Sequence, residues 1–337
     1  MSILITGGAG YIGSHTLIDL LLNDYDLVVI DNLSNSSFES IKRVEVLSGK
    51  KIDFYDMDLR DKSQLESLFK RYNFECVIHF AGLKSVGESV VEPLKYYDNN
   101  LTGSLNLLSV MKENGVKKII FSSSATVYGF PEQIPLVEGC RTGGTTNPYG
   151  TSKLFLEQIL KDVASSDRDW NIISLRYFNP VGAHPSGLIG EDPSGIPNNL
   201  VPYITKVAIG KLEKLSIYGN DYPTKDGTGV RDFIHVQDLA SGHTAALKKI
   251  DVLAGYHVFN LGTGKPHSVL ELISCFKKVT HKDISFVFVP RRPGDVGECW
   301  SSPELANEVL EWKAKYSLEE MLRDSWNWQI KNPDGYK

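Results

Sequence analysis

The chain opens with an apolar strand pattern that runs directly into a glycine-rich turn, Ile3-Leu-Ile-Thr-Gly-Gly-Ala-Gly-Tyr-Ile-Gly13. Gly7, Gly10 and Gly13 have the spacing G-x-x-G-x-x-G, and a helix pattern follows over Ser14–Leu22. Glycines at this spacing allow a tight turn, close approach of the backbone to a pyrophosphate, and close packing of helix on strand. The amino end of the helix adds N–H donors for the phosphates. The stretch therefore predicts a dinucleotide site, the alternative being an ordinary strand–helix turn.

An acidic residue stands where such a fold binds the ribose of its cofactor. Asp31 follows the second predicted strand, Leu27–Ile30, close to the spacing of roughly 20 residues that is typical of ribose-binding carboxylates. A carboxylate at this place would repel the 2′-phosphate of NADP. We therefore expect NAD as the cofactor.

The first half of the chain alternates short apolar runs with helix patterns, which is typical of a doubly wound sheet. Strands are expected at Ile3–Ile5, Leu27–Ile30, Ile52–Phe54, Cys76–His79, Lys118–Phe121 and Ile172–Leu175. Helices are expected at Ser14–Leu22, Lys62–Arg71, Leu101–Asn114 and Tyr149–Val163. We predict an α/β protein with a doubly wound, Rossmann-type parallel sheet.

The pattern changes after about Phe178. Residues 179–200 and Gly219–Arg231 are rich in Gly, Pro and Asn, which interrupt helices, and they flank a short apolar run at Leu215–Tyr218. Helix patterns at Val236–Lys249, Val269–Lys278 and Leu318–Ile330 mix with short strands. We predict an NAD-binding domain over residues 1–180 and a smaller mixed α/β substrate domain over 181–337. Residues of about 230–260 are expected to return to the first domain.

The composition excludes several classes of protein. Of 337 residues, 42% are hydrophobic and 23% charged, and the net charge is −5, which argues against a sequence-independent grip on nucleic acid. No apolar run approaches the roughly 18 residues of a membrane span. The four cysteines, Cys76, Cys140, Cys275 and Cys299, form no C-x-x-C pair. We expect a cytoplasmic enzyme with reduced thiols and no metal, with neither nucleic acid nor membrane as partner.

A candidate catalytic pair opens the helix predicted after Asn147. Tyr149 and Lys153 are four residues apart and so share one face of that helix. A free phenol titrates near pH 10. A neighbouring ammonium, together with the positive nicotinamide ring, would favour the phenolate and lower its pKa. The alternatives are a chance surface pair and a simple helix ion pair between Lys153 and Glu157.

Serines lie where an open α/β sheet places its ligands. Ser122, Ser123 and Ser124 end the fifth predicted strand, at the carboxyl edge of the sheet, where their hydroxyls can bind a substrate oxygen. A serine-rich turn is the alternative. His79 ends the fourth predicted strand, and we interpret it as a structural strand-end residue rather than a base.

Together these features resemble the extended short-chain dehydrogenase/reductase family. Further blocks narrow the resemblance to the UDP-glucose 4-epimerases, and they extend from the first strand to the last predicted helix. These blocks are Ile78–Lys84, Tyr96–Asn100, Phe121–Tyr128, Leu175–His184, Gly195–Leu200, Gly219–Tyr222, Gly227–His235 and Pro290–Arg292.

The resemblance implies reversible epimerisation at C4 of UDP-glucose and UDP-galactose, through a transient 4-keto sugar and a tightly bound NAD+. It implies that Tyr149 is the base for the 4-hydroxyl proton. Ser124 would bind the 4-oxygen and relay its proton. Lys153 would hold the nicotinamide ribose and lower the pKa of the phenol.

The resemblance also implies a set of binding residues. The expected cofactor-binding residues are Gly7, Gly10, Tyr11, Ile12, Gly13, Asp31, Asn32, Asn35, Ser36, Asp58, Leu59, Phe80, Ala81, Lys84, Asn99, Ser124, Tyr149, Lys153 and Phe178. The expected substrate-binding residues are Lys84, Ser124, Tyr149, Asn179, Asn199, Leu200, Tyr218, Arg231, Arg292, Asp295 and Cys299. In the family, helices like Leu94–Asn114 and Tyr149–Val163 form a homodimer bundle, so a homodimer is expected.

One position bears on substrate choice. Cys299 stands where some relatives carry a tyrosine that walls the hexose pocket. The smaller side chain would leave room for an N-acetyl group, so interconversion of UDP-GlcNAc and UDP-GalNAc is also expected. The alternative is a small buried cysteine with no role in selectivity. Phe233, where relatives often have tyrosine, lacks one hydroxyl for the substrate.

Two rival functions remain open at this point. A sugar-nucleotide dehydratase or decarboxylase of the same family shares the tyrosine–lysine pair. A 4,6-dehydratase would need carboxylates directly after the serine strand, where Ala125–Val127 stand. A non-catalytic NAD-binding sensor or scaffold would have no need of Ser124, Tyr149 and Lys153 together.

Overall fold

The computed structural model describes residues 2–193, 195–292 and 294–337. Contacts within the chain divide it into two compact units that interleave along the sequence. Unit 1 comprises Met1–Gly129, Arg141–Arg176 and Ala240–Phe259. Unit 2 comprises Phe130–Cys140, Tyr177–Leu239 and Asn260–Lys337. That the first binds the cofactor and the second the substrate stays a prediction.

A seven-stranded sheet forms the centre of unit 1, in the order β3-β2-β1-β4-β5-β6-β10. Its strands are β1 (Ser2–Thr6), β2 (Leu27–Asp31), β3 (Asp53–Asp56), β4 (Phe74–His79), β5 (Lys118–Ser124), β6 (Asn171–Tyr177) and β10 (Gly255–Leu261). The pairs from β3 to β5 are parallel. The first six strands follow the order of dinucleotide-binding folds. The predicted doubly wound α/β class is therefore confirmed, and the six predicted strands are all present.

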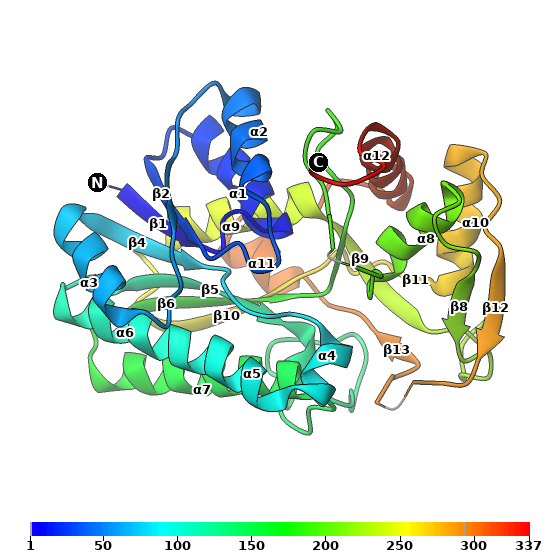
Figure 1. The fold of residues 1–337 in the computed structure, drawn as a ribbon. Coiled ribbons are helices and arrows are strands. Elements are labelled where there is room, and N and C mark those ends of the chain that lie inside the picture. Colours follow the sequence, from blue (N-terminus) through cyan, green and yellow to red (C-terminus); the bar gives the residue numbers. More distant parts are fainter. Residues whose placement is uncertain (1, 194, 293) are drawn as a thin grey trace. The chain divides into compact units, whose positions relative to one another are not determined.

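Helices cover both faces of this sheet (Figure 1). On one face lie α1 (Tyr11–Leu22), α2 (Phe38–Ser48) and α9 (Val236–Lys249), and on the other α3 (Lys62–Arg71), α6 (Gly103–Glu113) and α7 (Pro148–Ser166). The short helices α4 (Val86–Val91) and α5 (Pro93–Tyr97) and a π-helical turn, Asp98–Thr102, precede α6. A 3₁₀ turn, Ala125–Tyr128, follows β5. The core on the α3–α6–α7 face includes Val77, Leu107, Phe121 and Leu160, all buried.

Some of these helices were not predicted, although their ends carry ordinary signals. The side chain of Ser37 caps α2 by accepting a hydrogen bond from the Glu39 amide, and Gly49 ends the helix at a φ of 69°. Its interior also carries an apolar repeat, Phe38, Ile41, Val44 and Leu47, of which Ile41 and Val44 are buried.

Unit 2 is built on the strand β9 (Val230–His235). It pairs in parallel with β7 (Asn179–Val181) and β13 (Glu298–Cys299), and antiparallel with β11 (Pro266–Ser268). A separate parallel pair joins β8 (Leu215–Tyr218) and β12 (Phe286–Val289). The helices are α8 (Leu200–Ala208), α10 (Val269–Thr280), α11 (Glu304–Val309) and α12 (Leu318–Lys331). The helices predicted at Val236, Val269 and Leu318 are confirmed at their first residues.

Unit 2 has a hydrophobic core of its own. It includes Ile204 of α8, Leu215 of β8, Phe233 of β9 and Phe276 of α10, and Leu322 of α12 packs against the same cluster. The helices α10 and α12 both begin with a capping box, in which a serine hydroxyl and a glutamate side chain satisfy each other's backbone N–H groups.

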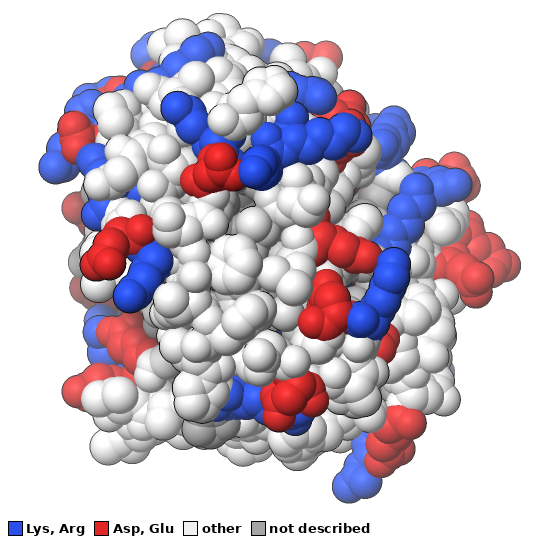
Figure 2. All heavy atoms as spheres, turned by 90° about the vertical axis from the view of Figure 1, so that its right-hand side faces the viewer, with Lys and Arg blue, Asp and Glu red and all other residues white. Residues whose placement is uncertain are grey.

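Charges on the surface occur in pairs of opposite sign. Figure 2 shows Lys and Arg side chains next to Asp and Glu side chains across one face of the molecule. In unit 2, Lys278 pairs with Glu319 at 2.6 Å and Lys277 with Asp283 at 2.5 Å.

Two features are absent from the described part of the chain. Within it, no helix is both long and apolar enough to cross a membrane. The same residues contain no group of three His, Cys, Asp or Glu side chains placed to hold a metal ion.

Candidate active site

The glycine-rich turn after β1 leaves no space for side chains. Gly7 has a φ of +71°, and a Cβ on it would lie 2.6 Å from the Ala81 amide nitrogen. A Cβ on Gly13 would lie 2.5 Å from the Gly7 carbonyl oxygen. Gly10 is the N-cap of α1 and has no side chain with which to cap the first amides. This bare helix amino end fits a dinucleotide pyrophosphate.

Asp31 ties the glycine-rich turn to the loop after β2. Its Oδ2 accepts a hydrogen bond from the Ala9 amide at 3.0 Å, and its Oδ1 accepts from the Leu33 amide at 3.0 Å and the Ser36 hydroxyl at 2.8 Å. Burial raises the pKa of this carboxyl, while the bonds from Ser36, Leu33 and Ala9 act in the opposite direction. The carboxylate stands at the carboxyl end of β2, where a ribose is bound in such folds.

The other cofactor positions predicted in unit 1 lie along the carboxyl edge of the sheet or just beyond it. Tyr11 and Ile12 open α1, Phe80 and Ala81 follow β4, and Asn32, Asn35 and Ser36 follow β2. Asn32 donates to Asp58 at 2.9 Å, and Arg60 holds the pKa of Asp58 well below its usual range. Asn99 lies in the π-helical turn. The structure thus brings these residues together around the end of the sheet.

Asn100 was not singled out from the sequence. Its buried side chain accepts from the Leu83 amide at 2.8 Å and donates to the Leu83 carbonyl at 3.1 Å and the Ser152 hydroxyl at 3.0 Å. It thereby joins the loop after β4 to the first turns of α7. A buried amide with these partners has no signature in a single sequence.

Tyr149 and Ser124 are hydrogen-bonding neighbours. Asn147 caps α7 by accepting from the Gly150 amide at 2.8 Å, with Pro148 in the first turn, and this places Tyr149 at the start of the helix. Burial raises the pKa of the phenol, and the hydrogen bond with Ser124 and the charge of Lys84 oppose that rise.

The electrostatics of the phenol within the protein chain alone differ in two respects from the prediction, which also counted the positive nicotinamide ring. The pKa of Tyr149 is raised rather than lowered, because the loss of hydration outweighs the nearby charge. The cation that acts on it is Lys84 rather than Lys153. The Lys84 ammonium also lies over the ring of Tyr11, 5.8 Å from its centroid.

Lys153 is 5% exposed. Its ammonium donates to the carbonyl oxygen of Ser122 at 2.6 Å and lies 4.8 Å from the centroid of the Phe121 ring. Burial lowers the pKa of this amine to about 8, and the negative charge of Glu157 opposes the shift. The expected alternative, a helix ion pair from Lys153 to Glu157, is not formed, because Glu157 pairs with Arg176 at 2.7 Å.

The three serines of β5 have different partners. Ser124 accepts from the Thr126 amide at 3.3 Å and the Thr126 hydroxyl at 3.0 Å. Ser123 donates to Glu157 at 2.5 Å, so its hydroxyl is engaged inside unit 1. Of the three hydroxyls that can bind a substrate oxygen, that of Ser123 is therefore already bonded to Glu157.

His79 is a structural residue, as predicted. It is buried between the hydroxyls of Thr6, at 2.7 Å, and Ser104, at 2.8 Å. Burial and the charge of Lys153 lower its pKa to about 3, so the ring is neutral at pH 7.

In unit 2, Arg231 and Cys299 are direct neighbours across the β9–β13 pair. Arg231 donates to the carbonyl oxygens of Val230 at 2.9 Å and Gly297 at 3.3 Å. Burial raises the pKa of the Cys299 thiol to about 11. The thiol is therefore protonated near pH 7 and acts as a small neutral side chain.

The strand that carries Arg231 is fixed by a carboxylate that sequence reasoning missed. Asp232 is fully buried and accepts hydrogen bonds from both the amide and the hydroxyl of Thr263, from the Gly264 amide, and from both the amide and the hydroxyl of Ser301. These bonds join β9 to the turn after β10 and to the segment after β13. Arg231 and Cys299 are thereby held in register.

A second cluster in unit 2 contains Arg292, Asp295 and Tyr218. Arg292 pairs with Asp295 at 2.8 Å and lies over the Tyr218 ring, 4.7 Å from its centroid. The charges of Asp295, Arg231 and Arg292 all act on the pKa of Tyr222, which burial raises. These predicted substrate residues are therefore close together around Tyr222.

The remaining binding positions predicted in unit 2 contact residues outside these two clusters. Asn199 is the N-cap of α8, which begins at Leu200, and its side chain donates to Glu191 at 2.7 Å. Asn179 opens β7 opposite Phe233 of β9. Phe178 is buried and is the one predicted cofactor residue that belongs to unit 2.

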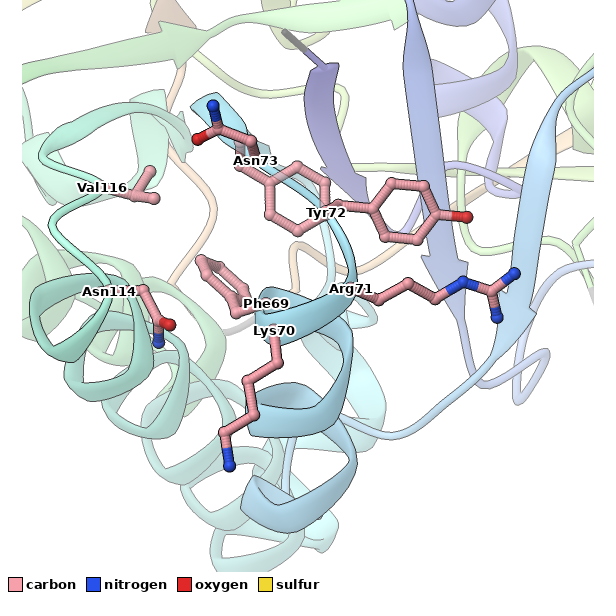
Figure 3. Close-up of a pocket in the computed structure, with 8 residues that line it drawn as sticks. Phe69, Lys70, Arg71, Tyr72, Asn73, Asn114 and Val116 are labelled. Carbon is pink, nitrogen blue, oxygen red and sulfur yellow. The ribbon is translucent and has the colours of Figure 1, made fainter.

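A hollow of about 280 Å³ lies at the opposite edge of the sheet. Figure 3 shows its lining between the end of α3 and the starts of β4 and β5, including Phe69, Asn73, Asn114 and Val116, with the Arg71 side chain pointing away from Val116. None of the predicted site residues lines it. Open α/β sheets bind their ligands at the carboxyl ends of the strands, so this hollow is not the candidate site.

Comparisons with known proteins agree on one family. The model of the NAD dependent epimerase/dehydratase family matches residues 3–262. The UDP-glucose 4-epimerase of Bacillus subtilis (strain 168) is 58% identical over 337 residues, which are 100% of this chain and 99% of that protein.

Solved structures of the same kind of enzyme are also similar to this chain. The UDP-glucose 4-epimerase of Bifidobacterium longum, in complex with NAD+ and UDP, has a TM-score of 0.97 and 55% identity, and the match covers 99% of this chain and 100% of that one. The UDP-Glc/GlcNAc 4-epimerase of Campylobacter jejuni has a TM-score of 0.85 and 39% identity, covering 98% and 99%. The chain belongs to the NAD dependent epimerase/dehydratase family.

Proposed function

We propose that this protein interconverts UDP-glucose and UDP-galactose by reversible epimerisation at C4 of the sugar. The observation that carries the proposal is the placement of Tyr149, Ser124 and Lys153 at the carboxyl end of β5, in the same unit as the glycine-rich turn. Relatives that match the whole chain are named for this reaction.

In this proposal NAD is bound at the glycine-rich turn and near Asp31, and it supplies a reversible acceptor for the C4 hydride. Tyr149 takes the proton of the 4-hydroxyl, and Ser124, its hydrogen-bonding neighbour, passes that proton between the sugar oxygen and the phenol. The charge of Lys84 acts on the phenol and favours the phenolate during the transfer. Lys153, one turn further along α7, is assigned to hold the nicotinamide ribose. The reaction has no net redox change.

Both faces of the sugar must be presented to the same catalytic groups, so the hexose itself is a poor anchor. The UDP moiety is common to both epimers, so contacts with UDP can supply most of the binding energy without favouring one epimer. Arg231 and Arg292 supply planar guanidinium groups suited to a diphosphate. We assign them this role together with Asn179, Asn199, Leu200, Tyr218 and Asp295.

N-acetylated sugar nucleotides are part of the same proposal. Cys299 is small and neutral and lies beside Arg231. The similar Campylobacter jejuni enzyme is described as a UDP-Glc/GlcNAc 4-epimerase. We infer that Cys299 leaves room for the acetyl group at C2 of the hexose.

A homodimer and a cytoplasmic location complete the proposal. Exposed apolar side chains gather on α4, α5 and α7, with Val90 61%, Val91 76%, Leu94 81% and Phe155 47% exposed. Apolar groups in such number on neighbouring helices are typical of a subunit interface. A second copy of this chain is the occupant we propose.

The purified protein, with no NAD added, should convert UDP-galactose to UDP-glucose, because the cofactor is retained between turnovers. Chromatography of the nucleotide sugars checks this. Accumulation of a free keto sugar, or of NADH by its absorbance, would instead indicate a dehydratase or a dehydrogenase.

Tyr149→Phe should lower kcat by about 10²–10⁴-fold, the range of general acid–base catalysis, with little change in the affinity for UDP. Steady-state kinetics and calorimetric titration with UDP measure the two effects. Tyr72→Phe is the matched control, since its hydroxyl bonds Tyr55 and Asp53 and the residue lines the hollow at the opposite edge of the sheet from Ser124. A Tyr149→Phe variant with near-native turnover would remove Tyr149 from the mechanism.

Cys299→Tyr should abolish most turnover of UDP-GlcNAc and leave turnover of UDP-galactose nearly unchanged, because the larger ring fills the space assigned to the acetyl group. The ratio of kcat/KM for the two substrates is the measurement, and Cys299→Ser serves as the size-matched control. An equal effect on both substrates would contradict this role for Cys299.

Leu94→Glu should convert the dimer to a monomer, because it puts a charge in the apolar surface of α5. Light scattering coupled to size exclusion measures the mass. Val46→Glu on α2, where the side chain is 74% exposed, is the control and should stay dimeric. A wild-type protein that is monomeric at micromolar concentration would refute the interface.

A further inference from the structure

Glu157 continues the face of α7 that carries Tyr149 and Lys153. The three positions follow at intervals of four residues and so lie along one side of the helix. Each meets β5: Tyr149 bonds Ser124, Lys153 donates to the Ser122 carbonyl at 2.6 Å, and Glu157 accepts from the Ser123 hydroxyl at 2.5 Å. Three turns of one helix thus contact three consecutive residues of one strand.

Glu157 is itself held rigidly. Arg176 of β6 donates from Nε to Glu157 Oε1 at 3.0 Å and from Nη2 to Oε2 at 2.7 Å, and both side chains are 6% exposed. The guanidinium lies over the ring of Tyr128, 4.7 Å from its centroid. Bidentate pairs of this kind fix the orientation of the carboxylate as well as its position.

We propose that Glu157 is a positioning residue for the reaction: it holds the serine strand against α7 and places a fixed negative charge one turn from the Lys153 ammonium. This inference rests on the proposed function of Tyr149, Ser124 and Lys153. A surface glutamate would suffice for helix stability, whereas this one is buried, bidentate and bonded to the residue next to Ser124.

The groups around Lys153 leave Glu157 as the main source of negative charge. From β4 it is faced by His79, which is neutral near pH 7, and from β5 by the ring of Phe121 and a carbonyl. On its own helix it is followed by Glu157, which raises its pKa against the effect of burial. Tyr149 is protonated near pH 7, since burial raises its pKa.

Glu157 in turn is faced from three elements. Arg176 of β6 and Tyr128 of the 3₁₀ turn lie on one side, and the Tyr256 phenol of β10, whose pKa is raised by burial and by Glu157, lies nearby. Of these, only Arg176 is charged near pH 7. Glu157 is the one negative charge that acts on Lys153 among the described residues. Removal of its carboxylate therefore leaves the Lys153 ammonium without an anionic neighbour in this part of the chain.

The test compares the wild type with Glu157→Gln and Glu157→Asp. Two readouts are followed against pH: kcat for UDP-galactose, and the ¹³Cε resonance of Lys153 in lysine-labelled protein. In Glu157→Gln the alkaline limb of the kcat profile and the Lys153 titration should both move down by about one pH unit or more, and turnover at pH 9 should fall about tenfold relative to wild type. Glu157→Asp keeps the charge and should keep both close to their wild-type positions.

A merely structural role would lower stability or kcat without moving either titration, and that result would overturn the inference. Glu157→Gln removes the carboxylate that pairs with the buried Arg176 and can fail to fold. The double variant Glu157→Gln/Arg176→Met removes both charges, and it should show the same downward shift of the Lys153 titration. Asp162→Asn, an exposed charge removal on the same helix, should move neither readout.

The two proposals fail separately. A wild type that does not convert UDP-galactose refutes the proposed function. The Lys153 resonance still reports whether Glu157 controls its charge.

Discussion

The buried ammonium of Lys153 constrains the arrangement of the candidate catalytic groups. An ion taken out of water is costly unless polar or charged partners replace its hydration. Here the replacement is the Ser122 carbonyl, the Phe121 ring and the charge of Glu157. Each partner needs a defined register of α7 on β5, and that register is also what puts Tyr149 beside Ser124. The energetic demand of one lysine thus fixes the geometry of its neighbours.

Unit 2 reaches a similar rigidity by a different route. Asp232 is buried without an ion-pair partner among the described contacts, and its two oxygens are satisfied by five neutral donors. Neutral donors stabilise the carboxylate while leaving the adjacent Arg231 without a salt bridge to it in the described part of the chain. Arg231 donates to backbone carbonyl oxygens, which do not neutralise its charge. The positive charge of this guanidinium can therefore interact with an anionic ligand.

Most of the fold could be predicted from the sequence, because its parallel strands are continuous apolar runs and its glycine-rich turn follows the first of them. The helix α2 was not predicted, although its two ends carry ordinary signals and Phe38, Ile41, Val44 and Leu47 repeat every three residues. The interleaving of the two units along the sequence was harder to predict. Nothing in the local sequence of residues 130–140 indicates that they belong to unit 2.

The candidate site was predictable where a short motif carries it, as for Tyr149 and Lys153. It was not predictable where long-range contacts decide. The sequence suggested a helix ion pair between Glu157 and Lys153 as one alternative. In the structure Glu157 instead forms a bidentate pair with Arg176, which lies on β6. Likewise, the pKa of Tyr149 depends on burial and on Lys84, which only the folded chain brings close.

The proposed division of cofactor binding and substrate binding between the two units has an evolutionary consequence. The glycine-rich turn, Tyr149, Ser124 and Lys153 belong to unit 1, whereas Arg231, Cys299 and Arg292 belong to unit 2, and each unit has its own hydrophobic core. Substitutions supported by separate cores are nearly additive in their effects. Under the proposed function, substitutions in unit 2 therefore change which sugar nucleotide is bound, while the acid–base residues assigned to unit 1 stay intact.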